Sequence, residues 1–176
     1  SLTKNITVPV AGAGIACLKV ASDFEKGMST VQSICGASGK ELQNLSDKAK
    51  EMGAKTKFSA TEATDAFKYM AMAGWNTQEM MDGIEGVMYL AGATGEDLAQ
   101  TSDIVTDALT AFGMSAKETN RFVDVLAKTA NNSNTNVGML GESFQYVAPV
   151  AGALKYNVED ISTALGLMAN LSLIHI

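Results

Sequence analysis

Three glycines at a fixed spacing constrain the fold of this chain more than any other feature of its sequence. Gly74, Gly113 and Gly152 are equally spaced, and an internal period of this size, about 39 residues, is typical of stacked repeats. Apolar residues recur every three or four positions before each glycine and again after it, which is the period of one helix face. The sequence therefore predicts a repeated unit of helix, turn and helix, with Gly74, Gly113 and Gly152 as the structural turn glycines.

The apolar stripes on both sides of the glycines define three predicted helical hairpins in residues 56–170. The stripes before the glycines are Ala63, Phe67, Met70 and Ala73, then Leu98, Val105, Ala108, Leu109 and Phe112, then Val137, Leu140, Phe144, Val147 and Ala151. The stripes after them are Ile84, Val87, Met88 and Ala91, then Phe122, Val125, Leu126 and Ala130, then Ile161, Leu165 and Met168. The fold class predicted here is all-α, with an approximately 39-residue internal repeat.

Polar residues mark the ends of these helices. Three pairs have the spacing of a capping box, in which a side chain at the helix start and a Glu three residues later satisfy each other's backbone N–H groups. The pairs are Ser59 with Glu62, Asn76 with Glu79, and Ser115 with Glu118. Loops are predicted at residues 92–95 and at the polar run 131–136, which is the best candidate for a flexible hinge. Pro149 lies inside a stripe and should kink its helix.

Two further helices are predicted before the hairpins, in residues 15–55. Apolar positions at threes and fours run from Ile15 to Ile34, and a second stripe runs from Leu42 to Met52 with Gly53 as its expected cap. Residues 1–14 are an apolar segment, and because the chain opens at Ser1 rather than at Met we expect this segment to be the start of a fragment.

Charge and composition exclude several classes of function. The formal net charge is −6, and only 18% of the residues are charged, so the chain lacks the clustered Lys and Arg that a direct nucleic-acid site requires. Aromatic residues make up 6% and there are two Pro, which argues against a β-sandwich or barrel. The longest uncharged apolar stretch runs from Asn5 to Leu18, and it is too short for a membrane span, which takes about 20 residues.

No set of residues suggests catalysis, cofactor binding or a metal centre. His175 is the one His and lies at the second-last position, and Cys17 and Cys35 are widely separated in the sequence, so neither a base beside a nucleophile nor a CxxC pair is evident. Carboxylates gather in the first turns of predicted helices, where they complement the helix dipole. We therefore expect no enzymatic activity. Trp75 is the candidate partner anchor, because it follows the turn at Gly74 and is predicted to hold either a neighbouring helix or a partner chain.

Four segments occur together in one order: Thr56–Ala63, Met70–Trp75, Asp107–Gly113 and Tyr146–Ala151. With them the chain, from about Asp23 to Asn170, resembles the core region of tail tape measure proteins of long-tailed phages and prophages of Gram-positive bacteria. In that family, the stretch that follows a helix like residues 167–170 continues through a glycine-rich segment. Residues 171–176 depart from this pattern, and we therefore expect them to be a non-native tail.

The resemblance implies a virion structural protein that takes part in tail assembly. Such a protein occupies the lumen of the growing tail, sets tail length while tube protein polymerises around it, and is released at genome ejection. It implies as partners the tail tube protein, tail assembly chaperones and other copies of itself, and as locations the tail lumen and, during assembly, the host cytoplasm. It supplies no catalytic residue and no cofactor. The residues alone also allow a second reading, a helical-repeat adaptor or peptide-binding domain with a concave surface.

Overall fold

The computed structural model describes the backbone of residues 2–174 and the side chains of residues 17–174. Within this range every regular element is helical, as the apolar period predicts, and the all-α class is confirmed. The elements in order are α1 (Leu2–Cys35), α2 (Lys40–Lys55), α3 (Ala60–Met72), α4 (Thr77–Thr94), α5 (Leu98–Phe112), the 3₁₀ helix η1 (Ala116–Glu118), α6 (Thr119–Asn132), α7 (Val137–Ala153) and α8 (Val158–Asn170).

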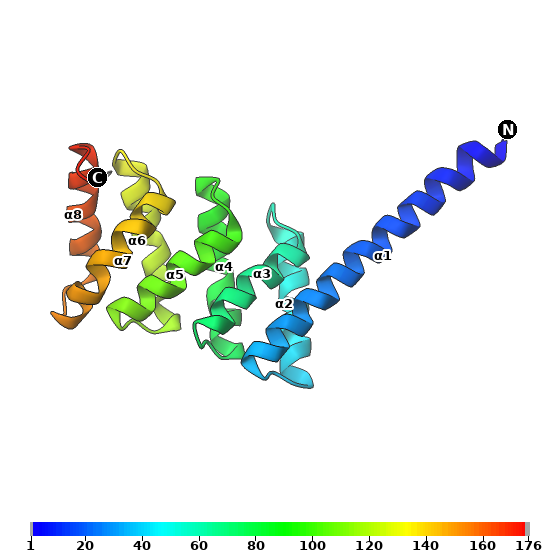
Figure 1. The fold of residues 1–176 in the computed structure, drawn as a ribbon, viewed down its shortest axis with the longest axis horizontal. Helices are drawn as coiled ribbons and strands as arrows, with labels where there is room; N and C mark the ends of the chain where they lie inside the picture. Colours follow the sequence, from blue (N-terminus) through cyan, green and yellow to red (C-terminus); the bar gives the residue numbers. More distant parts are fainter. Residues whose placement is uncertain (1, 175–176) are drawn as a thin grey trace.

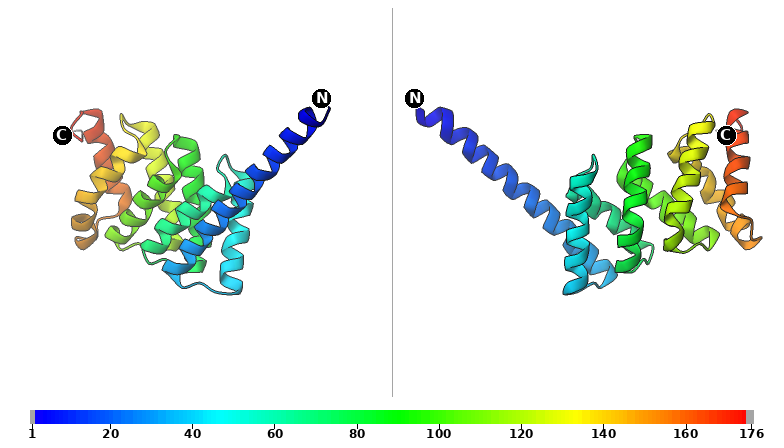
Figure 2. Two further views of the ribbon diagram at one scale, coloured as in Figure 1. Left: turned by 45° about the vertical axis from the view of Figure 1, so that its right-hand side comes forward. Right: turned by 180° about the vertical axis from the view of Figure 1, so that it is seen from behind.

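The helices form a row of four hairpins arranged in two layers (Figure 1). One layer contains α1, α3, α5 and α7, each in contact with the next, and the other contains α2, α4, α6 and α8 in the same way. The α1–α2 and α7–α8 hairpins lie at opposite ends of the row, and the first half of α1 extends away from it, as Figure 2 shows from two more sides. Each hairpin therefore covers the apolar face of its neighbour, which is the architecture of an α-solenoid.

The predicted capping boxes are present at the helix starts. The Ser59 hydroxyl accepts from the Glu62 amide at 3.2 Å, while the Glu62 carboxylate accepts from the Ser59 amide at 2.7 Å. Asn76 and Glu79 make the same two bonds, at 3.0 and 2.8 Å. The Ser115 amide donates to the Glu118 carboxylate at 3.0 Å. Local sequence therefore fixes where these helices begin, because each box satisfies amides that the helix itself leaves unpaired.

The N-terminal part differs from the prediction. α1 begins at Leu2, so the expected separate segment, as far as it is described, is continuous with the first helix. α2 continues past Gly53 to Lys55, and Gly53 is not its cap. A Cβ atom on Gly53 would lie 2.6 Å from the Ala60 nitrogen, which shows that this glycine lets the start of α3 approach α2 closely.

Two predicted loops are shorter than expected. Gly92 lies within α4, and Gly95 caps that helix with φ 77°. The first two residues of the polar run 131–136 belong to α6, which ends at Asn132. The backbone amide of Asn134 donates to the side-chain oxygen of Asn170 at 2.7 Å, and Asn136 caps α7. The loop is therefore held at one end by α8 and at the other by the cap of α7, which is an arrangement unlike the flexible hinge that the sequence predicts.

The core runs along the whole row between the two layers. Phe67, Phe122 and Phe144 are fully buried. The Phe144 ring lies 5.7 Å from the Phe112 ring and 5.9 Å from the Phe122 ring, measured between centroids, so aromatic packing joins the last two hairpins. Pro149 lies inside α7, as predicted. No helix within residues 2–174 is long and apolar enough to cross a membrane.

Candidate functional site

The turns inside the second and third hairpins share one backbone arrangement. Gly74 has φ 85° and Gly113 has φ 68°, both in the left-handed region. The amide of the following residue reaches back over the turn: Trp75 donates to the Met70 carbonyl at 3.0 Å, and Met114 donates to the Leu109 carbonyl at 2.8 Å. This pattern is a Schellman motif, which satisfies carbonyls at a helix end and requires a residue that tolerates positive φ.

The prediction for Gly152 is wrong, because this residue lies within α7 and not in the turn. The left-handed residue is Lys155, with φ 59°, and the Tyr156 amide donates to the Ala151 carbonyl at 2.9 Å. The last turn therefore comes three positions later than the repeat predicts, and a constant period is not confirmed. α7 continues for about one helical turn beyond the expected end. The sequence signal that was missed is Asn157, the cap of α8, which follows Ser115 at this longer interval.

Gly152 serves helix packing. A Cβ atom built on it would lie 2.3 Å from the Ala111 carbonyl oxygen and 3.1 Å from the Phe112 Cα. Only a residue without a side chain allows α7 to cross α5 at this distance. Gly141 faces α5 in the same way, since its Cβ would lie 2.6 Å from Ile104. Gly141 and Gly152 therefore determine how closely the last two hairpins stack.

The Trp75 side chain is inside the row of hairpins. Only 7% of it is exposed, and a Cβ atom on Gly83 would lie 2.5 Å from its ring. The ring therefore fills the space beside α4, and it is not available at the surface as a partner anchor. The sequence predicted that Trp75 holds either a neighbouring helix or a partner chain. The structure supports the neighbouring helix, and the prediction of a partner anchor is wrong. Burial was missed because it depends on α4, which packs back over the turn.

Ion pairs join successive hairpins along the layer of α2, α4, α6 and α8. Arg121 on α6 forms a two-point pair with Glu159 on α8, with nitrogen–oxygen distances of 2.6 and 2.7 Å. This hydrogen bonding lowers the pKa of Glu159 from its ordinary value. Lys48 on α2 lies 3.5 Å from Glu85 on α4. These contacts are largely on the surface, so each adds little to stability.

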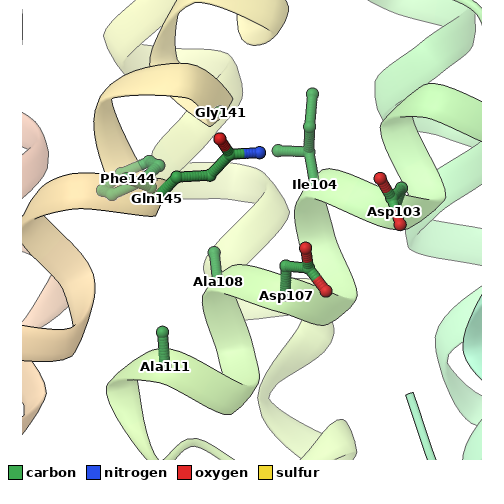
Figure 3. A pocket seen from close by; sticks show the side chains of 8 residues that line it. All are labelled: Asp103, Ile104, Asp107, Ala108, Ala111, Gly141, Phe144 and Gln145. Carbon is green, nitrogen blue, oxygen red and sulfur yellow. The ribbon is translucent and has the colours of Figure 1, made fainter.

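A small open cavity of about 210 Å³ lies between α5 and α7, at the Gly141 crossing (Figure 3). Asp103 and Asp107 of α5 line one side, and Phe144 and Gln145 of α7 line the other. Burial, and then the neighbouring Asp107 charge, raises the pKa of the Asp103 carboxyl. The lining offers carboxylate and amide groups but no nucleophile with an adjacent base. We interpret the cavity as a consequence of helix crossing.

The titratable residues that the structure describes are dispersed. Among them no three His, Cys, Asp or Glu side chains come close enough together to hold a metal ion. Cys17 and Cys35 both lie on α1, and at the rise of an α-helix their separation is ~27 Å, too far for a disulfide. His175 lies outside the described residues. The expected absence of catalytic, cofactor and metal residues remains a prediction.

The fold and these contacts define a class of protein, an all-α row of stacked hairpins. The residues with special roles, such as Gly152 and Trp75, serve the packing of its helices. Residues 46–174 match the model of a family described as phage-related minor tail protein. The chain therefore belongs to the phage-related minor tail protein family, as the sequence resemblance predicts. No solved structure matches it.

Two relatives carry the name of the tape measure protein. The chain is 37% identical over 169 residues to the tape measure protein of Pneumococcus phage Dp-1, covering 96% of this chain and 15% of that protein. It is 26% identical over 170 residues to the probable tape measure protein of Clostridium phage phiCD119, covering 88% of this chain and 18% of that protein. The chain thus spans less than a fifth of the curated relatives it matches.

Proposed function

We propose that this chain acts as part of a phage tail tape measure protein, a structural scaffold in the lumen of the tail tube that sets tail length during assembly and leaves at genome ejection. The observation that carries the proposal is the 37% identity, over nearly the whole chain, to a tape measure protein of Pneumococcus phage Dp-1. The proposed partners are the tail tube protein, tail assembly chaperones and other copies of itself, with the host cytoplasm as the place of assembly. The proposed role is structural and involves no catalysis.

The row of hairpins supports a scaffolding role on physical grounds. Each hairpin contacts mainly its neighbours, so the stability of such a row is approximately the sum of local units and interfaces. A unit can then be removed or added without redesigning one central core. A protein of this kind changes its length in proportion to its residues, which is the property that a length-setting scaffold needs.

Tail length in the phage or prophage that encodes this chain provides the test. Deleting residues 76–114 removes one helix from each layer, together with the turn, and joins two equivalent turns. A row that stays stacked in the tail would shorten by the spacing of one hairpin, about 10 Å. A segment drawn out as continuous helix would shorten the tail by its helical length, ~59 Å. We expect tails that are shorter by up to about this amount, measured by electron microscopy.

A recoded gene with an unchanged amino-acid sequence is the matched control, and it should give tails of the original length. Deletion tails of unchanged length, with the deleted protein present in the particles, would contradict the proposal. That result would favour the adaptor or peptide-binding alternative, which makes no prediction about tail length.

A further inference from the structure

The cavity between α5 and α7 combines an apolar lining with an acidic side (Figure 3). Its apolar lining includes the buried residues Ala108 and Phe144, and Gly141 at the helix crossing. Asp103 and Asp107, one helical turn apart on α5, form the acidic side. A long basic side chain fits such a lining, because its methylene groups pack on apolar surface while its charged end reaches a carboxylate.

The two carboxylates lack a counter-charge from the chain itself. Among the side chains of residues 17–174, no Lys or Arg forms an ion pair with Asp103 or Asp107. Burial and then the Asp107 charge raise the pKa of Asp103, which is the expected effect of negative charges that no cation offsets. A cation in the cavity would therefore stabilise both ionised carboxylates.

A comparable groove between α1 and α3 has balanced charges. It also lies at a crossing glycine, Gly27, and it is lined by two acids and two bases: Asp23, Asp65, Lys26 and Lys68. Lys68 precedes Asp107 by one repeat unit, so a lysine position of the first groove is an acid in the second. The first groove stays open although further hairpins follow it, and such a groove therefore does not depend on which hairpin ends the row.

The layer of α3, α5 and α7 is acidic as a whole. It carries one base, Lys68, and five acids: Glu62, Asp65, Asp103, Asp107 and Glu142. Residues 69–116 contain neither Lys nor Arg. A surface of one sign attracts a partner of the opposite charge and repels a second copy of this acidic chain. The charges therefore favour a basic segment of a different protein.

We propose that the cavity between α5 and α7 binds a lysine or arginine side chain of a partner protein. The charged end lies against Asp103 and Asp107, and the methylene stem packs on the apolar lining. This contact goes beyond the proposed function, because a tail scaffold and an adaptor would both have a use for it. It is measured as peptide binding and the tail role as tail length, so each fails separately.

NMR titration of the isotope-labelled 176-residue chain tests the contact. The probe is a short alanine peptide with one central lysine. We expect the amide signals of residues 103–111 and 141–145 to shift most, with a Kd of about 1 mM, because a single side chain supplies little affinity. The same peptide with glutamine in place of lysine should bind at least about threefold more weakly, because it loses the charge.

Two double variants locate the charge effect. Asp103→Asn/Asp107→Asn removes both charges with little change of shape and should weaken binding of the lysine peptide at least about threefold. The matched control is Asp47→Asn/Asp82→Asn, which removes two exposed carboxylates from the layer of α2 and α4. It lowers the negative charge of the chain equally and should leave binding unchanged. Circular dichroism verifies that both variants are folded.

Shifts spread over all acidic surfaces, with equal weakening in both double variants, would overturn the proposal, because they indicate general attraction of a basic peptide. Equal binding of the lysine and glutamine peptides would also overturn it. So would the absence of shifts at ~10 mM lysine peptide, well above the expected Kd. If Asp103→Asn/Asp107→Asn fails to fold, the place of the shifts in the original chain and the comparison of the two peptides decide the matter.

Discussion

The turns of the last two hairpins follow the same backbone path but use different residues at the left-handed position. Gly113 has φ 68° between α5 and α6, and Lys155 has φ 59° between α7 and α8. An L-residue such as Lys adopts this conformation at a cost of about 1–2 kcal/mol relative to Gly. The comparison teaches that the Schellman hydrogen bonds and the following cap determine where the turn forms, and that glycine makes the turn easier without being required.

Gly113 and Gly152, which share the spacing of the sequence repeat, consequently serve different purposes. Nothing lies within 4 Å of a Cβ built on Gly113, so the advantage of glycine at this position is its backbone angle and not the space it leaves. A Cβ on Gly152 would meet the backbone of α5 at 2.3 Å, so that residue is needed for space. The comparison is tested by substitutions that distinguish a requirement for positive φ from a requirement for room beside the Cα atom.

The largest effect is expected for Gly152→Ala. The new methyl group must displace the α5 backbone, and because overpacking of this kind costs typically 1–3 kcal/mol, we expect destabilisation of about 3 kcal/mol. Urea unfolding followed through the fluorescence of Trp75 measures it. Gly92→Ala is the control, because it is also within a helix but its Cβ would lie 3.9 Å from the nearest atom, on the Phe58 ring. That variant should be neutral or stabilised by up to ~1 kcal/mol. Similar results for both variants would break the comparison.

Gly113→Val should have the next largest effect. A β-branched side chain is strained at the positive φ of this turn. Such strain costs of order 1–3 kcal/mol, and we expect destabilisation of about 2 kcal/mol in the same urea titration. Gly113→Asn adds a side chain that tolerates the left-handed region, so it should lose less than half as much. Equal losses for Val and Asn would show that space, and not backbone angle, limits this position.

Lys155→Gly should have a smaller effect of the opposite sign. Glycine removes the strain of the left-handed lysine but gains freedom in the unfolded chain, so we expect stabilisation of about 0.5 kcal/mol. Differential scanning calorimetry is suited to the small shift, and Lys155→Ala is the control that keeps the strain. If Lys155→Gly is no more stable than Lys155→Ala, the turn does not carry the strain that its backbone angle implies.

The smallest effect concerns Asp103, which lines the gap between these two hairpins. Its pKa is raised in the folded chain by burial and then by Asp107, so the folded state holds this proton more tightly than the unfolded state. The contribution of Asp103 to stability is therefore fully present below the ordinary pKa of Asp and is lost as pH rises through the raised value. Asp103→Asn should remove this contribution to the dependence of stability on pH, measured by urea midpoints across the acidic range. An unchanged pH profile in Asp103→Asn would contradict the assignment.

Much of the helical framework was predictable because its signals are local. The apolar period marks each stripe, and the capping box Ser59–Glu62 forms between residues three positions apart. The turns at Gly74 and Gly113 follow from a stripe that ends beside a glycine and a cap. These features depend on a few neighbouring residues, and the chain carries that information wherever it folds.

The remaining features depend on neighbours that are distant in the sequence. Gly152 has the same spacing as the two turn glycines, and only its contact with Ala111 of α5 shows that it serves packing. Trp75 is buried because α4 returns across it, and the separate N-terminal segment became part of α1. The sequence by itself determined the helices, their caps and the hairpin unit. The tertiary structure decided which glycines lie in turns and which lie where two helices cross. The physical reason is that helix crossing depends on distances in space, and spacing along the chain does not specify these distances.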